Sequence, residues 1–159
     1  FLLRRSNMAK SMIAVVGANG FIGSRVVEAL LERGVSVRGS VRDEAEPVEH
    51  ILALGLESIV YADLSDAAAL ARVVCGCSAV VVAAAPNVTT TANRGDGAQN
   101  AKLQSTSSAA IVVAASEAGV ERVIFLGSAT AVASEPREAV YTEATSRRSR
   151  FPRIVARTC

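Results

Sequence analysis

Aromatic residues and net charge are both scarce in this sequence. It has no tryptophan, two tyrosines and four phenylalanines among 159 residues, and its formal net charge is +2. Single-stranded nucleic acids stack on aromatic side chains in positively charged grooves, and a small net charge gives little attraction for a polyanion. The composition therefore disfavours a nucleic-acid partner.

Cysteine and histidine are also few. The chain has three cysteines, Cys75, Cys77 and Cys159, and one histidine, His50. A structural zinc ion needs four ligands at defined spacings, and no second pair lies near Cys75 and Cys77. We therefore expect no metal site. Three cysteines cannot complete a disulfide framework, which fits a reducing compartment, and we expect a cytoplasmic location.

Long apolar runs are absent as well. No stretch approaches the roughly 20 apolar residues that a transmembrane helix needs, so we expect no membrane association. The opening segment "FLLRRSNMAK" does not begin with methionine. Its apolar part is too short for a signal peptide, and its charges follow that part rather than precede it. Met8 is a candidate start; residues 1–7 would then be upstream read-through or the remainder of a targeting segment, and organelle import stays open.

Short apolar runs alternate with segments of helical periodicity. The pattern predicts strands at 12–18, 35–41, 57–63, 79–85 and 121–128. It predicts helices at 21–33, 47–54, 66–74 and 98–118. Ser65 or Asp66 would cap the third helix. This alternation indicates βαβ units, so the predicted fold class is α/β, a Rossmann-type doubly wound parallel sheet with five strands present. A complete fold of this class has at least one more strand and helix, so we expect the C-terminal part to be missing.

Three regions follow from this pattern: an N-terminal extension at 1–11, the α/β domain at 12–134 and an irregular basic tail at 135–159. The tail holds a cluster of arginines: Arg147, Arg148, Arg150, Arg153 and Arg157. No fold signal accompanies them, so a solvated tail is favoured over a nucleic-acid patch.

Three glycines, Gly17, Gly20 and Gly23, follow the first predicted strand at three-residue intervals. Gly17 would allow a sharp turn, Gly20 a close approach of a pyrophosphate to the backbone, and Gly23 close packing of the first helix. The helix N-terminus would present N–H groups and a partial positive charge to the phosphates. The alternative is a tight turn that binds nothing, but the strand before and the helix after favour a nucleotide site.

The segment "GANGFIG" resembles the glycine motif of the short-chain dehydrogenase/reductase superfamily, in particular of its extended and atypical branches. The segments "GFIGSRVVEALLERG", "SVRDEAE", "YADLSD", "VVVAAAP" and "EAGVERVIFLGSATAV" follow in the order seen in dihydroflavonol-reductase-like and cinnamoyl-CoA-reductase-like proteins. The resemblance covers about residues 12–134. It implies an NAD(P)-binding Rossmann domain whose parent activity is reduction of a small-molecule carbonyl. The glycine-loop residues implied to contact the cofactor are Gly17, Asn19, Gly20, Phe21, Ile22 and Gly23.

The end of the second predicted strand bears on the choice between NAD and NADP. NAD-binding domains place an acid there for the adenosine ribose, whereas this chain has Val41, followed by Arg42 and Asp43. The guanidinium of Arg42 would clamp a 2′-phosphate, and the resembled family uses the arginine of this "VRD" segment in that way. We therefore expect NADP rather than NAD. Two alternatives stay open: Asp43 as the ribose acceptor, and Arg42 as a surface charge paired with Asp43 or Glu44.

Two further segments are implied to line the cofactor. By resemblance, Asp63 accepts a hydrogen bond from the adenine amine and Leu64 packs on the ring; the alternative for Asp63 is a cap on the following turn. Ala83, Ala84 and Ala85 are small enough to let the backbone pass near the ribose and pyrophosphate, although core packing would also explain them.

Catalysis in the resembled superfamily uses a serine, a tyrosine and a lysine. Ser128 stands at the serine position, with a hydroxyl that bonds to local backbone as the alternative. Tyr141 is followed four residues later by Thr145, not lysine. A second alignment places Val155 at the tyrosine position and Cys159 at the lysine position, and neither has the required chemistry. The sequence therefore predicts a catalytically impaired member.

Two other functions stay open. The segments "VRGSVRD", "LGLESIVYADLSD" and "GVERVIFLGS" also resemble NmrA-like regulators, which sense NADP without catalysis and act through a partner protein. The second alternative is an inert fragment.

Overall fold

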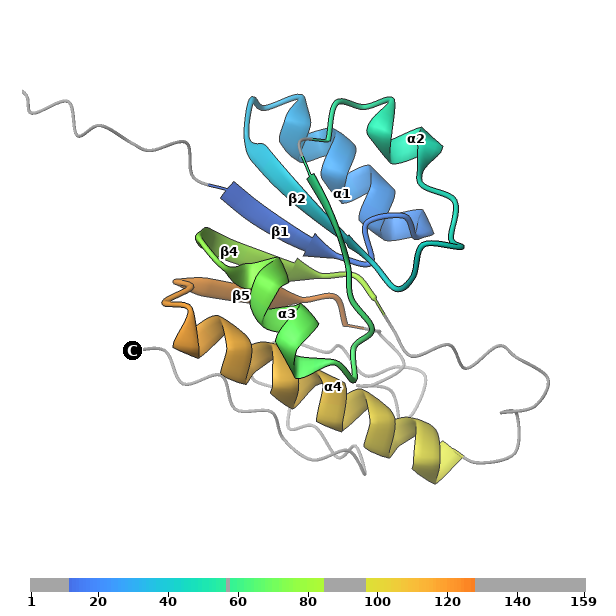
Figure 1. Ribbon diagram of the computed structural model, residues 1–159, viewed down its shortest axis with the longest axis vertical. Coiled ribbons are helices and arrows are strands. Elements are labelled where there is room, and N and C mark those ends of the chain that lie inside the picture. Colours follow the sequence, from blue (N-terminus) through green and yellow to red (C-terminus); the bar gives the residue numbers. More distant parts are fainter. Residues whose placement is uncertain (1–11, 57, 85–96, 128–159) are drawn as a thin grey trace, which may run out of the picture. The chain divides into compact units, whose positions relative to one another are not determined.

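The computed structural model describes residues 12–56, 58–84 and 97–127 of the chain, and Figure 1 shows their arrangement. Within these residues, five parallel strands form one sheet in the order β3-β2-β1-β4-β5. The strands are β1 (Met12–Val16), β2 (Ser36–Val41), β3 (Ser58–Tyr61), β4 (Cys77–Val82) and β5 (Arg122–Phe125). The predicted doubly wound α/β fold is confirmed.

Helices cover both faces of the sheet. They are α1 (Phe21–Leu31), α2 (Glu49–Leu52), α3 (Ala67–Val74) and α4 (Gly97–Glu117). In Figure 1, α1 and α2 lie on one face, and α3 and α4 lie on the other. The direction of the chain explains this division. It moves one way along the sheet from β1 to β3 and the opposite way from β3 through β4 to β5, and right-handed crossovers then place the helices on opposite faces.

The side chains of β1 alternate between the two cores, as the period of a strand requires. Ala14 and Val16 pack with Leu70 of α3 and Ile111 of α4. Val15 faces the other way, into a cluster that contains Val27 of α1 and Ile51 of α2. Because both faces are covered, β1 reads as a continuous apolar run, and so does the second half of β4.

Four strands, β1, β3, β4 and β5, end earlier than their apolar runs predict, and hydrogen bonds explain the ends of β1 and β4. β1 ends at Val16 because the N–H groups of Gly17 and Ala18 both donate to the Ser40 carbonyl, which stops the regular ladder. β4 begins at Cys77 and ends at Val82, since the N–H groups of Ala83 and Ala84 both donate to the Val16 carbonyl. The chain turns at these points, and both turns border the site described below.

The described residues as far as Phe125 belong to one compact unit. All elements discussed here belong to it. Across the described ranges, no helix combines the length and apolar character needed to cross a membrane.

Candidate nucleotide-binding site

A cleft of about 520 Å³ lies at the carboxyl ends of the strands. The parallel register brings these ends to one edge: Val16 pairs with Ser40 and Val82, and Val41 pairs with Tyr61. The chain leaves β1 for β2 on one side and places β4 on the other, so the cleft lies at the topological switch point where doubly wound sheets bind ligands. The lining residues are Val16, Gly17, Asn19, Gly20, Ser40, Arg42, Glu46, Ala62, Asp63, Leu64, Ser65, Ala83, Ala84 and Ser107.

The protein's own packing requires glycine at two of the three loop positions. Gly17 has a φ of +81°, and a Cβ there would lie 2.7 Å from the backbone nitrogen of Ala84. A Cβ on Gly23 would overlap the carbonyl of Gly17. Gly20 differs, because its φ of −72° suits any residue and a Cβ would meet only the Gly17 carbonyl oxygen, at 3.3 Å. Of the three loop glycines, Gly20 is therefore the one that folding alone requires least, and it lies on the cleft wall.

The N-terminus of α1 is open to an anion. Gly20 is its N-cap, no side chain caps it, and its first turn contains no acidic residue. The first N–H groups of a helix have no partner within the helix and carry partial positive charge. By contrast, Asp66 caps α3 by accepting from the Ala69 N–H at 3.0 Å, which confirms one of the two predicted caps. The glycine loop thus ends at a helix terminus suited to a phosphate.

Arg42 lines the cleft and is held by two acids of its own chain. Its Nε lies 3.3 Å from Asp43 Oδ2, and its Nη2 pairs with Glu46 Oε1. Glu46 also accepts from Asn19 Nδ2 through Oε2, at 2.7 Å. Arg42 therefore lines the cleft and also forms one of the surface pairs considered above, with Asp43 rather than Glu44.

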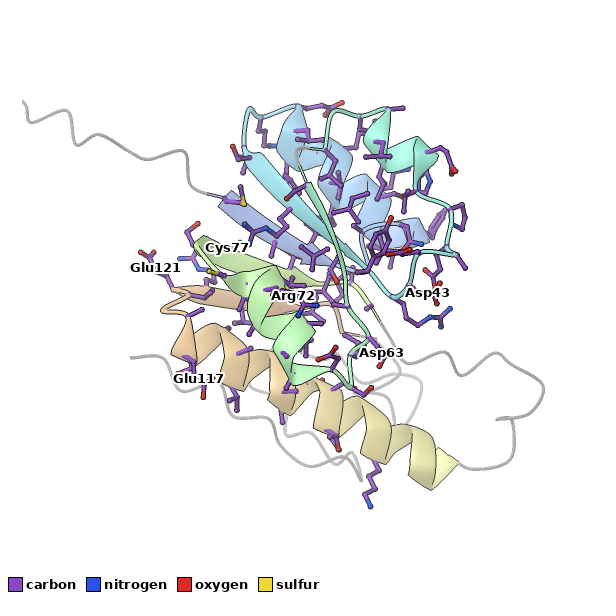
Figure 2. All side chains as sticks on the ribbon, viewed as in Figure 1. Asp43, Asp63, Arg72, Cys77, Glu117 and Glu121 are labelled. Carbon is purple, nitrogen blue, oxygen red and sulfur yellow. The ribbon has the colours of Figure 1, made fainter. Side chains whose placement is uncertain are left out.

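Asp43 starts the turn that places Glu46. Its Oδ1 accepts from the Ala45 N–H at 2.9 Å, and its carbonyl accepts from the Glu46 N–H at 3.3 Å. Asp43 is not among the residues that line the cleft. Figure 2 shows Asp43 and Asp63 on the side of the sheet where β2 and β3 end.

Asp63 combines a local role with a place in the cleft wall. Its Oδ1 accepts from the Ser65 N–H at 2.8 Å and from Ser65 Oγ at 2.5 Å, so it does cap the following turn. These two hydrogen bonds lower the pKa of Asp63, and the charge of Arg42 lowers it further. The group is therefore a carboxylate at neutral pH. Leu64 lies beside it on the cleft wall.

The other predicted residues divide into three groups. Ala83 and Ala84 line the cleft, and Ala84 lies against Gly17. Phe21 is 89% exposed and Ile22 54% exposed at the start of α1, and neither lines the cleft, nor does the buried Gly23. Ala85 and Ser128 lie outside the described residues.

Sequence reasoning missed Glu46, Ser40, Ser65 and Ser107. Glu46 stands four residues after Arg42, but the segment between them is a turn, and no helical pattern marked the pair. Ser107 reaches the cleft from α4, about 90 residues after the glycine loop, and no local signal could have found it.

Residues 17–150 match the NAD(P)H-binding family. The chain is 39% identical over 136 residues to cinnamoyl-CoA reductase 1 of Oryza sativa, an alignment that covers 82% of this chain and 38% of the relative. It is 41% identical over 83 residues to dihydroflavonol 4-reductase of Arabidopsis thaliana, which covers 48% of this chain and 22% of the relative. The chain therefore spans less than two fifths of the length of either reductase.

A solved structure is also similar. It is a short-chain dehydrogenase/reductase superfamily protein from Agrobacterium tumefaciens with bound NAD, 29% identical, with a TM-score of 0.67. The superposition covers 86% of this chain and 38% of that protein. Family match, homologues and fold agree: the chain belongs to the extended short-chain dehydrogenase/reductase superfamily and carries its NAD(P)-binding Rossmann domain.

Proposed function

We propose that the chain binds NADP(H) in preference to NAD(H), as the nucleotide-binding part of a carbonyl reductase. The observation that carries this proposal is Arg42, a cation on the cleft wall directly after a strand that ends in the apolar Val41. A guanidinium binds a phosphate through charge-assisted hydrogen bonds, whereas the NAD-binding pattern has an acid at the strand end.

Each part of the cofactor would have matching residues on the cleft wall. The N–H groups at the start of α1 would hold the pyrophosphate, with Gly20 leaving room for it. The Asp63 carboxylate would accept from the adenine amine, and Leu64 would pack on the ring. Ala83 and Ala84 would border the ribose and pyrophosphate, because small side chains let the backbone approach closely.

The parent reaction is reduction of a small-molecule carbonyl, for which the bound cofactor supplies the hydride. Ser128 would donate a hydrogen bond to the carbonyl oxygen. The 159 residues contain no Tyr-x-x-x-Lys motif, because Ser65 follows Tyr61 and Thr145 follows Tyr141 at the fourth place. We therefore propose that these residues bind the cofactor without turning it over.

Calorimetry with NADPH and NADH tests the cofactor preference. Arg42→Ala should weaken NADPH binding by about 1–2 kcal/mol, about five- to thirtyfold, because it removes a charge-assisted contact at a half-exposed site. NADH affinity should change little. Equal losses for the two cofactors would exclude the phosphate contact.

A regulatory NADP sensor is the second candidate, favoured by the same lack of a Tyr-x-x-x-Lys motif. Such a protein would act through a partner protein whose affinity changes with the bound cofactor. Pull-down experiments with NADP-loaded and cofactor-free chain distinguish it, since only a sensor would capture a partner in one state.

A further inference from the structure

Glu46 links two parts of the cleft wall, the arginine that follows β2 and the glycine loop. Its Oε1 pairs with Arg42 Nη2, and its Oε2 accepts from Asn19 Nδ2 of the glycine loop at 2.7 Å. The Glu46 side chain is 24% exposed and that of Arg42 48% exposed, so the Arg42–Glu46 pair is less exposed to solvent than the Arg42–Asp43 pair. Glu46 is therefore anchored from two sides.

The Arg42 guanidinium has three nitrogens, and two of them, Nε and Nη2, already face carboxylates of this chain. A bidentate contact with a phosphate uses two of the three nitrogens. Any such choice includes Nε or Nη2. A 2′-phosphate therefore either displaces one of these carboxylates or, because Nη1 and Nη2 each carry two N–H groups, binds beside the Glu46 carboxylate.

The charges on the cleft wall add to this competition. Among the described residues that line the cleft, Arg42 is the sole basic side chain, and Glu46 and Asp63 are acidic. A phosphate monoester brings a charge of about −1.5 to −2 at neutral pH. Glu46 thus both occupies the arginine that the phosphate needs and repels the phosphate itself.

We propose that Glu46 is a specificity-determining residue that limits the preference for 2′-phosphorylated cofactors by competing with the phosphate for Arg42. The proposal rests on the proposed function, in which Arg42 holds that phosphate. It predicts that removing the charge of Glu46 strengthens the binding of a 2′-phosphorylated ligand more than that of its unphosphorylated counterpart.

The test uses adenosine 2′,5′-bisphosphate and 5′-AMP, which differ only in the 2′-phosphate, and calorimetry on the whole chain. Glu46→Gln removes the charge and keeps an oxygen that can accept from Asn19. It should raise the ratio of bisphosphate affinity to AMP affinity about three- to tenfold, as expected for a partly screened ion pair. Glu44→Gln is the matched control, because Glu44 is exposed, lies outside the cleft lining and carries the same charge. It should leave the ratio unchanged.

The double variant Arg42→Ala/Glu46→Gln separates the outcomes. If Glu46 competes for Arg42, the gain from Glu46→Gln is reduced in the Arg42→Ala background to the part that comes from direct repulsion of the phosphate. A gain that is undiminished there overturns the competition, because Glu46 would then act on the phosphate by repulsion alone. An unchanged ratio in Glu46→Gln also overturns it, and the proposed function survives if Arg42→Ala alone lowers the ratio. If Arg42→Ala does not lower the ratio, the proposed function fails first.

Discussion

At the scale of single residues, the three loop glycines have different reasons to be glycine. Gly17 needs its left-handed φ of +81°, and Gly23 lies against the Gly17 carbonyl, so folding accounts for both. Gly20 has an ordinary backbone conformation and one close neighbour for a Cβ. Under the proposed function, the pyrophosphate that approaches Gly20 would be the main reason for the absence of a side chain there.

Gly20→Val should therefore abolish nucleotide binding while the fold persists. The added branch would stand where the pyrophosphate must approach the start of α1. Calorimetry with NADPH measures the binding, and circular dichroism monitors the fold.

Gly23→Ala is the comparison for this variant. Its Cβ overlaps the Gly17 carbonyl, so it should lose structure and binding together. Wild-type NADPH affinity in a folded Gly20→Val variant would mean that Gly20 serves only the turn.

At the scale of elements, β2 stabilises the end of α3 through Arg38. The Arg38 Nη1 donates to the carbonyls of Arg72, Val73 and Cys75, at 3.2, 3.0 and 2.6 Å. These carbonyls lie at the C-terminal end of the helix, where backbone oxygens lack partners within the helix and carry partial negative charge. Figure 2 labels Arg72, near the end of α3, and Cys77, which begins β4 shortly after it.

Arg38→Met should lower the free energy of unfolding by about 1–2 kcal/mol, because it leaves partly buried carbonyls without a charged donor but keeps most of the aliphatic stem. Urea denaturation measures the loss. Arg25→Ala provides the control, since Arg25 is exposed and pairs with Glu28 on its own helix, a contact worth a few tenths of a kcal/mol. Equal effects of the two variants would argue against the role of Arg38 as a cap.

At the scale of the whole molecule, the cleft has the features of a dinucleotide site, whereas the 159 residues contain no Tyr-x-x-x-Lys motif for proton transfer. General acid catalysis contributes about 10²–10⁴-fold to such reactions. Without a Tyr-x-x-x-Lys pair, the chain should show no NADPH oxidation above background with aldehydes, flavanonols or acyl-CoA thioesters. Absorbance of NADPH follows the reaction.

Ser128→Ala checks the assignment of the catalytic position. Turnover in the wild-type chain that disappears in this variant would contradict the predicted impairment. Tyr141 would then be the first residue to substitute as the proton donor.

The sequence by itself determined the elements and the class of ligand. Strand and helix periodicity depend on neighbouring residues, so each of the five strands and four helices of the described ranges appeared in the pattern. The cap at Asp66 and the loop at Gly17 are likewise local features. Glycine between a strand and a helix indicated a nucleotide because the necessary geometry lies within a few residues.

Only the tertiary structure decided which distant residues meet. The strand order placed Ala84 against Gly17, brought Arg38 to the end of α3 and carried Ser107 to the cleft. The turn after β2 also pairs Arg42 with Glu46, which changes the expected binding of a phosphate. The contacts between distant residues depend on how buried faces pack together, and the spacing of residues along one chain does not encode them locally.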